Sequence, residues 1–349
     1  MEFGSFMEFH TRQGMSQHTA FSESFKHILQ AEEFGLDGVW LAESHFTPGR
    51  SVLSSPLILA SAIAERTKRI KIGTAVHILP LANPLKTAEE TATLDHLSGG
   101  RFEFGIGRSG LPSSYEGFNI PYAESRQRFF EYLDIILKAW TKERFSHNGK
   151  FFRFNEVCLV PKPFQSPHPV IRIATTTTDT FPIIGKMGFP IFTGLRGLGI
   201  SEVADQVESY IKAWNEANHT GPLNIFLRVP VYVASKKDMA LRDPEASFMR
   251  QFRRLGNQLA QSSSLTTSET EKERILRINT LANITWNTVL KEKVVVGTPD
   301  MVIERLQEMK EILHLNGIIA EFNAGELIPP ERIESSLKLF CSEVIPAFR

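Results

Sequence analysis

The chain has little cysteine and no excess charge of either sign. Its 349 residues include two cysteines, Cys158 and Cys341, and neither belongs to a close pair of cysteines or histidines. A disulfide framework and a zinc site of the usual spacing are therefore not expected. Basic and acidic residues number 39 each. This balance argues against a general nucleic-acid binder and against a polybasic membrane binder.

Long apolar runs are also missing. No stretch reaches the roughly 20 apolar residues that a transmembrane helix needs. The amino terminus enters a strand pattern without a basic region and an apolar core, so we expect no signal peptide and a cytoplasmic protein. With 42% hydrophobic and 22% charged residues, the composition is that of a packed chain whose length suits one large α/β domain.

What the sequence does contain is a regular alternation of strand-like and helix-like segments. The predicted strands are 2–9, 37–42, 70–77, 102–106, 170–174, 190–193, 225–234 and 317–322. The predicted helices are 21–34, 56–66, 84–97, 122–140, 180–187, 201–218, 301–313 and 330–347. This order predicts a single (β/α)8 TIM barrel over residues 1–349. A doubly wound sheet is the alternative, but no Gly-x-Gly-x-x-Gly follows the first strand.

Two stretches interrupt the alternation. The first, at 144–169, is rich in phenylalanine and proline. A polar insertion at 235–293 follows the seventh strand and contains hydroxyl-rich runs at 262–264 and 266–268. Long insertions in βα loops are commonly lids or binding segments, so we expect 235–293 to act as an active-site lid. The aromatic residues of the first stretch either line an apolar substrate entrance or pack beneath the loop: Phe151, Phe152, Phe154 and Phe164.

Polar residues gather where the predicted strands end. In parallel α/β folds the carboxyl ends of the strands form the ligand-binding face. We therefore expect these residues to face one cavity: His10, Glu43, Ser44, His45, Thr74 to His77, Arg108, Ser109, Thr175 to Thr180, Gly194 and Arg196.

The segment 98–110 predicts an anion site. Gly105 and Gly107 allow a backbone to come close to a ligand, and the planar fork of Arg108 suits a phosphate. The loop 175–180 offers hydroxyls and N–H groups at a helix start. A surface arginine and an ordinary N-cap turn are the plain alternatives. Placed on neighbouring strands, however, the two segments would hold one phosphate from two sides.

Histidines supply the acid–base candidates, because histidine titrates near neutral pH. His45 is the first choice, and Glu43 would either orient it or form a salt bridge across the barrel. His10 and His77 are weaker candidates. Each histidine could equally be a packed, hydrogen-bonded residue at the barrel mouth. A metal site built from them is not expected, since none of the spacings is typical of metal ligands.

Several stretches carry a resemblance to a known family. They are 35–46, 72–80 with Asn83-Pro84, 94–102 continuing to Arg108, 296–300 and 336–346. On these stretches the chain resembles the bacterial luciferase-like, flavin-dependent monooxygenases nearly from end to end. The resemblance implies a (β/α)8 barrel, usually dimeric through the helices 56–66 and 84–97. It also implies reduced FMN supplied by a separate reductase.

The same resemblance assigns roles to residues of this chain. Arg108 would bind the flavin phosphate, with Ser109 and the hydroxyls of Thr176, Thr177 and Thr180. Ala75-Val76, next to Thr74, matches the position of a non-proline cis peptide under the flavin ring. Glu43, Ser44, His45 and His10 are the catalytic candidates.

The sequence also departs from the family pattern. The luciferase catalytic subunit has Glu-His-His-Phe where this chain has Glu43-Ser44-His45-Phe46. A reactive cysteine of some members is Gly107 here. Light emission is therefore not expected, whereas oxygenation is.

The leading hypothesis is an FMNH2- and O2-dependent monooxygenase with a flavin C4a-hydroperoxide. Its substrate would be an apolar aldehyde, ketone or biosynthetic intermediate, and His45 would be a proton donor or hydrogen-bond anchor. Three alternatives stay open. They are an F420-dependent hydride-transfer enzyme, a non-catalytic subunit of a luciferase-like heterodimer, and a metal hydrolase. The insertion argues against the second of these, and the ligand spacing argues against the third.

Overall fold

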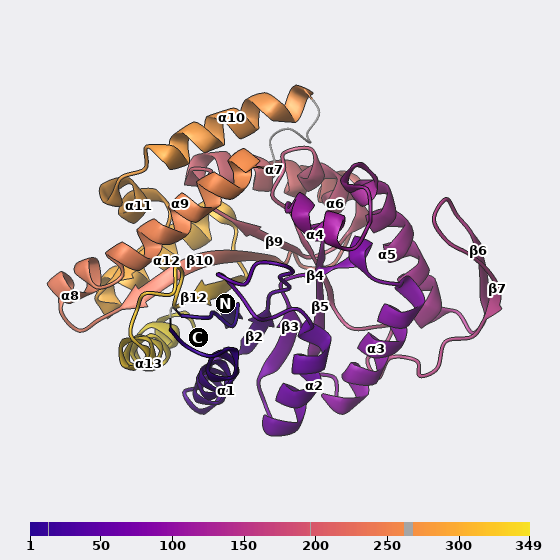
Figure 1. Cartoon of the computed structure of the whole chain (residues 1–349), viewed down its shortest axis with the longest axis horizontal. Coiled ribbons are helices and arrows are strands. Elements are labelled where there is room, and N and C mark those ends of the chain that lie inside the picture. Colours follow the sequence, from indigo (N-terminus) through magenta and orange to yellow (C-terminus); the bar gives the residue numbers. More distant parts are fainter. Residues whose placement is uncertain (13, 196, 262–267) are drawn as a thin grey trace.

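The computed structural model describes residues 1–12, 14–195, 197–261 and 268–349 as a closed parallel barrel (Figure 1). Arg196 and the residues 262–267, named above, lie outside the described residues. The last barrel strand, β12, pairs with the first, β1, and this pairing closes the sheet. The predicted (β/α)8 barrel is thus confirmed. Its strands, in barrel order, are β1 (Glu2–Met7), β2 (Gly38–Leu41), β3 (Lys71–Thr74), β5 (Phe102–Gly107), β8 (Ile171–Ala174), β9 (Ile191–Gly194), β10 (Ile225–Val233) and β12 (Gly317–Glu321).

Helices cover the outside of the barrel (Figure 1). Several begin with proline, whose missing N–H would have no partner in the first turn anyway. Asn83 caps α3 by accepting hydrogen bonds from the N–H groups of Leu85 and Lys86. Within the described part of the chain, none of the helices is long and apolar enough to span a membrane. The barrel helices are α1 (Gln17–Glu33), α2 (Pro56–Arg66), α3 (Pro84–Leu97), α5 (Ser125–Thr141), α6 (Thr180–Met187), α7 (Ile200–Glu216), α12 (Pro299–Leu313) and α13 (Pro330–Leu339), and a short α4 (Pro112–Gly117) follows β5.

The structure corrects three predicted boundaries. The strand predicted at 70–77 divides into β3 and β4 (His77–Ile78), and the peptide bond between Ala75 and Val76 is cis, as the resemblance implies. Helix α1 begins four residues before the predicted Phe21, because the Ser16 hydroxyl caps it by accepting from the Thr19 N–H. The helix predicted at 330–347 ends as an α-helix, α13, at Leu339 and continues as a π-helical turn at Phe340–Val344 and a 3-10 turn at Ile345–Phe348.

Aromatic rings and one arginine fill the barrel interior below the strand ends. The Trp40 ring contacts Phe192 and Phe226, with ring centroids 5.0 and 6.0 Å away. A Cβ atom at Gly73 would lie 2.1 Å from the Trp40 ring, so this strand position has room for glycine alone. The guanidinium of Arg172 lies 3.7 Å over Phe226 and donates to Glu103 at 2.9 Å. This packed interior leaves ligand binding to the carboxyl ends of the strands.

The insertion predicted after the seventh strand is largely helical. It contains α8 (Lys237–Arg242), α9 (Glu245–Gln261), α10 (Ser268–Ala282) and α11 (Trp286–Glu292). Strand β11 (Val295–Gly297) follows and pairs with the end of β10. The sequence analysis predicted neither these helices nor β11. Helices α9 and α10 lie side by side along one edge of the barrel (Figure 1), and buried Phe248 and Phe252 of α9 pack on a cluster with Tyr232.

The excursion at 144–169 forms the hairpin β6 (Phe145–Asn148) and β7 (Arg153–Val157), which projects from the barrel (Figure 1). The Phe151 ring stacks under the Arg128 guanidinium, Phe152 and Phe154 pack against the core, and Phe164 is exposed. None of these four rings lines the main cavity described below. The interpretation of this stretch as a substrate entrance is therefore wrong, and it gives no ground for an apolar substrate.

Candidate active site

A cavity of about 300 Å³ opens at the carboxyl ends of the strands, a size typical of small-molecule sites. Its lining falls into three zones, each with its own chemistry. We name them the anion end (Arg108, Ser109, Arg126, Thr176, Thr177, Thr180 and Arg277), the slot (Ala42, Ala75, Val76, Gly107 and Ala174) and the guanidinium wall (Glu8, Arg50 and Arg228).

The anion end brings three guanidinium groups to one side of the cavity. Arg126 forms an ion pair with Asp179, and Arg277 donates to the backbone carbonyl of Thr176 at 3.4 Å. Burial raises the pKa of Asp179, but the hydrogen bonds from Arg126, Thr177 and Thr180 and the charge of Arg126 together outweigh burial and lower the pKa. Three guanidiniums at one end of a cavity give that end a basic character, which suits a phosphate monoester.

The cofactor residues predicted at this end lie together. Arg108, Ser109, Thr176, Thr177 and Thr180 all line the cavity, and the hydroxyls of Thr177 and Thr180 are 2.7 Å apart. Sequence reasoning missed Arg126 and Arg277. Arg126 lies in the first turn of α5, whose sequence has an amphipathic pattern but no sign of a ligand site. Arg277 lies on α10, a helix that was not predicted.

Small side chains shape the slot. Ala42, Ala75 and Ala174 each bring a single methyl group to the cavity, and Gly107 brings none. A Cβ atom at Gly107 would lie 2.7 Å from Cγ2 of Val76, closer than real Cβ contacts. A narrow space between small residues fits a flat ring better than a bulky group. Thr74, predicted as a cofactor residue, does not line the cavity and instead donates its hydroxyl to the Gly105 carbonyl at 2.6 Å.

Glu43 lines the cavity and is held by two histidines. His45 Nε2 donates to its Oε1 at 2.8 Å, and His77 Nδ1 donates to its Oε2 at 2.6 Å. The backbone N–H of Ile78 donates to Oε2 as well, at 3.1 Å. Burial raises the pKa of Glu43, but the charge of His77 and the hydrogen bond from His45 outweigh burial and lower the pKa to about 2. Glu43 is therefore a fixed carboxylate and not a proton donor at neutral pH.

The predicted acid–base histidine does not line the cavity. His45 is buried behind Glu43, between the rings of Phe46 and Phe118. Its Nε2–H is directed at Glu43, so His45 orients the carboxylate. Ser44 does line the cavity, and its hydroxyl lies 2.6 Å from that of Thr47. In this chain a hydroxyl, not an imidazole, therefore faces the cavity beside Glu43.

His10 is also outside the main cavity. Its Nδ1 lies 3.2 Å from Glu326 and its Nε2 lies 3.6 Å from Glu8. It faces a second cavity, between β1, α1 and α13, that also contains Arg12 and His27. The expectation that all strand-end residues face one cavity is thus wrong for eight of the described residues: His10, His45, Thr74, His77, Thr175, Thr178, Asp179 and Gly194.

The guanidinium wall was not predicted from the sequence. Arg50 forms an ion pair with Glu8, and Arg228 donates to Glu321 through Nε and Nη2 at 3.0 and 2.8 Å. Burial raises the pKa of Glu8, but Arg50 and Arg228 outweigh burial and hold the pKa well below its usual range. Arg50 lies in the loop after β2 and Arg228 within β10, so only the closed barrel brings them together.

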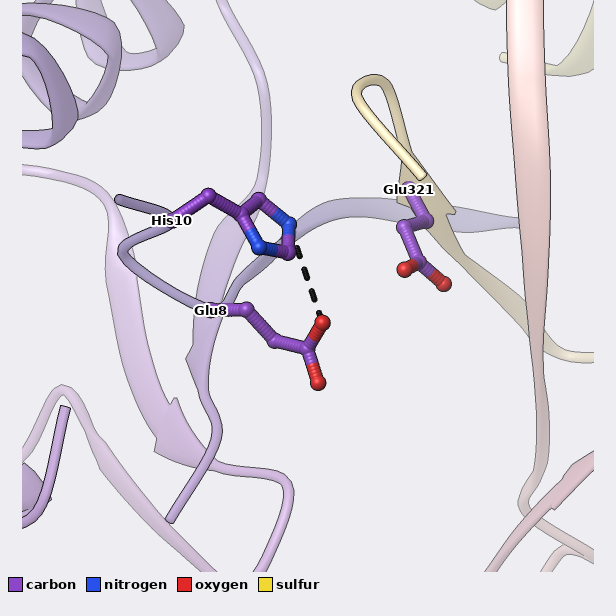
Figure 2. A group of neighbouring side chains, drawn as sticks. All are labelled: Glu8, His10 and Glu321. Carbon is purple, nitrogen blue, oxygen red and sulfur yellow. Dashed lines mark ion pairs between the residues drawn. The ribbon is translucent and has the colours of Figure 1, made fainter. Parts of the chain in front are cut away.

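Glu8, His10 and Glu321 also form a group whose ligand atoms lie within 4.8 Å of one another (Figure 2). Glu8 and His10 follow β1, and Glu321 ends β12. Two carboxylates and an imidazole could ligate a divalent metal. Arg50 and Arg228, however, already bind both carboxylates, and a dication would meet two positive charges at short range. The geometry favours an ion-pair network at this place.

Comparison with known proteins fits this barrel and its cavity. The family model described as luciferase-like monooxygenase matches residues 1–314. The chain belongs to the luciferase-like monooxygenase family, a class of flavin-dependent oxidoreductases. The alkanal monooxygenase alpha chain of Photorhabdus luminescens is 25% identical over 359 aligned residues, which cover 99% of this chain and 96% of that one.

Solved structures show the same fold. The oxygenating constituent of 3,6-diketocamphane monooxygenase from Pseudomonas putida, in complex with FMN, matches with a TM-score of 0.82 and 22% identity, over 99% of this chain and 98% of that one. An F420-dependent secondary alcohol dehydrogenase matches with a TM-score of 0.74 and 16% identity, over 100% and 99%. At these identities both comparisons support the fold alone.

Proposed function

We propose that the protein is an FMNH2- and O2-dependent monooxygenase. The observation that carries this proposal is one cavity, in a barrel of this family, whose lining includes both the three arginines of the anion end and a slot of small residues. A flavin mononucleotide has a terminal phosphate and a flat ring system, so it fits both zones. Arg108, Arg126, Arg277 and the hydroxyls would hold the phosphate, and Ala75, Val76 and Gly107 would border the ring.

Reduced FMN, when bound, supplies the electrons that activate O2. The route through a flavin C4a-hydroperoxide that the resemblance implies is part of the proposal. The chain's own contribution is binding, orientation and exclusion of water. Glu43, fixed by His45 and His77, keeps a negative charge at the cavity wall, and the Ser44 hydroxyl stands beside it for hydrogen bonding to the substrate.

The substrate, on this proposal, is an organic aldehyde, ketone or biosynthetic intermediate with an apolar part. Apolar side chains that line the cavity support this: Phe6, Leu111, Phe129, Phe130, Leu255 and Leu259. The insertion 235–293 serves as the lid, because its helix α9 contributes Leu255, Gln258 and Leu259 to the lining. A separate reductase supplies the reduced flavin, and the protein acts as a homodimer.

Anaerobic titration with photoreduced FMN tests the proposal. Removal of a charged hydrogen-bond donor typically costs about 1.5–3 kcal/mol, so we expect Arg108→Ala to weaken FMNH2 binding by roughly 10- to 100-fold. Arg144→Ala, an exposed arginine of the excursion, is the matched control and should bind as the wild type does. Equal affinity of wild type and Arg108→Ala would contradict the assignment of the anion end.

A second candidate is F420-dependent hydride transfer, which the structural similarity to an F420-dependent enzyme supports. The same titration with reduced F420 separates the two cofactors by affinity. A non-catalytic subunit would show neither binding nor substrate turnover as a pure protein.

A further inference from the structure

The guanidinium wall faces the same cavity as the slot but lies apart from the anion end. Glu8 follows β1, Arg50 lies in the loop after β2 and Arg228 lies on β10, whereas the anion end comes from β5, α5, α6 and the loops beside them, together with α10. If the anion end takes the cofactor phosphate, as the proposed function requires, the wall is left for another molecule. This inference therefore rests on the proposed function.

The arginines of the wall are held in fixed orientations. Glu321 accepts two hydrogen bonds from Arg228, and the Arg228 guanidinium stacks over the Phe6 ring at 3.4 Å. Arg50 donates to Glu8 and, at 3.5 Å, to Gln258 of α9. The two side chains are only 19% and 12% exposed, respectively. A preorganised guanidinium loses little entropy when it binds a further acceptor.

The wall presents more positive than negative charge to the cavity. Arg50 and Arg228 line the cavity together with one carboxylate, that of Glu8. Behind the lining, Glu321 pairs with Arg228 and Glu326 pairs with Arg254, whereas Arg250 is 42% exposed and adds no buried charge. Glu8 and Glu326 also raise the pKa of His10 despite its burial, which favours a further positive charge here. Positive charge that is poorly solvated is stabilised by an anionic partner.

Polar atoms of the wall also lack partners. Among the described residues, the Nε–H donor of Arg50 is buried and forms no hydrogen bond. Within the described chain, Arg228 donates hydrogen bonds through Nε and Nη2. The N–H groups of its Nη1 therefore remain available to a ligand. An unsatisfied buried polar atom costs about 1–3 kcal/mol, so a ligand that supplies acceptors here gains that energy.

From this geometry we propose that the guanidinium wall binds a carboxylate group of the substrate. The planar carboxylate matches the planar guanidinium fork, and one negative charge matches the excess. The rest of the molecule would extend along Phe6 and the α9 residues Leu255 and Leu259, toward the slot. The substrate class is therefore an organic monoacid with an apolar body, in contrast to an uncharged alkanal.

Binding measurements on the full-length chain test this proposal without any turnover. Octanoate, decanoate, phenylacetate and 2-naphthoate are each compared with the corresponding methyl ester by isothermal titration calorimetry, with and without FMN. We expect at least one acid to bind about tenfold or more tightly than its ester, which corresponds to about 1.4 kcal/mol. We also expect this preference to decline as NaCl is added. Four acids that all bind no better than their esters would overturn the proposal.

Variants locate the acid preference within the wall. Arg228→Met and Arg50→Met should bring acid affinity down to that of the ester while ester affinity stays within twofold. Arg250→Gln is the matched control, because Arg250 belongs to the same network through Glu326 but does not line the cavity, and it should keep the preference. An acid preference that survives both methionine variants contradicts the assignment. Thermal melting shows whether each variant is folded, and the wild-type comparison stands by itself if one is not.

The two proposals can fail separately. If FMNH2 binds and no acid is preferred, the substrate class is wrong while the monooxygenase proposal stands. If an acid is preferred and neither FMNH2 nor F420 binds, the cofactor proposal is wrong while the carboxylate site stands.

Discussion

Single side chains decide the shape of the slot, and Gly107 is the tightest position. Its backbone lies so close to Val76 that even a methyl group would overlap with Cγ2 of that residue. The absence of a side chain at Gly107 therefore allows Val76 to occupy its position in the slot.

We predict that Gly107→Ala weakens FMNH2 binding about tenfold or more. The added methyl group must displace Val76 within the slot, and such overpacking typically costs about 1–3 kcal/mol. The matched control is Gly110→Ala, since Gly110 also lines the cavity but a Cβ atom there would meet nothing within 4 Å. Fluorescence titration with FMNH2 measures both. Equal weakening in the two variants would show that the Val76 contact is irrelevant.

Glu43 gives a prediction for pH. Its pKa is lowered from an ordinary value of 4.5 to about 2 in the fold, a change that corresponds to roughly 3 kcal/mol of stabilisation. Because the folded-state pKa is the lower one, this stabilisation is complete above pH 4.5. It is lost as the pH falls from 4.5 toward 2.

We therefore expect Glu43→Gln to lower the free energy of unfolding by about 3 kcal/mol at pH 5 to 6, with a smaller difference at pH 3.5. Urea unfolding at each pH measures the difference. Glu116→Gln, an exposed glutamate on α4, should match the wild type throughout. A Glu43→Gln difference that stays constant down to pH 3.5 would contradict the role of an ionised carboxylate.

At the scale of elements, helix α9 is the part of the insertion that meets the cavity. Its apolar face packs on the cluster with Tyr232, and its polar face reaches the barrel through Arg250 and Arg254, which bind Glu326 after β12. Lys293, at the end of the insertion, is buried and donates to the Leu198 carbonyl in the loop before α7. Ion pairs from α9 and one lysine at the carboxyl end of the insertion thus attach the proposed lid to the barrel.

We predict that Arg254→Ala loosens α9 without unfolding the barrel. The variant leaves the buried Glu326 with weaker partners, and loss of one partner of a buried ion pair costs about 3–5 kcal/mol. Hydrogen exchange followed by mass spectrometry should show faster exchange in α9 and unchanged exchange in β1 and β5. Arg253→Ala, an exposed position of the same helix, is the control. Unchanged α9 exchange in Arg254→Ala would rule out this attachment.

For the whole molecule, the proposed homodimer involves the outer face of helices α2 and α3. Helix α2 buries Leu57, Ala60 and Ile63 against the barrel, while Ile58 on the same helix is 73% exposed. The proposed dimer through α2 and α3 would remove this side chain from water.

We predict that the wild-type chain sediments with twice the mass of one chain at micromolar concentration. Ile58→Glu should shift it toward the monomer, because a buried charge without a partner opposes association. Ile312→Glu introduces the same change at an exposed isoleucine of α12 and should remain dimeric. Monomeric wild-type protein at 10 μM would contradict the dimer, and so would a dimeric Ile58→Glu variant.

The sequence by itself determined the barrel, because its evidence is local. Apolar spacing, prolines at helix starts and glycines after helices act within one or two turns of chain, and they placed α2, α3 and α6 at the bounds that the structure has. The residues of the anion end that follow β5 and β8 were predicted for the same reason. In a barrel the carboxyl ends of neighbouring strands must meet, so Arg108 and the threonines come together once the strands are known.

Only the tertiary structure decided which polar residues face the cavity and which support it. His45 looked like a proton donor in sequence, yet the direction of its ring is set by Glu43 and His77, which come from two different strand ends. The guanidinium wall unites Glu8, Arg50 and Arg228 over more than 200 residues of chain, and no local pattern marks any of them. Such contacts depend on closure of the sheet, because charge pairing between distant segments has no periodicity that a sequence can display.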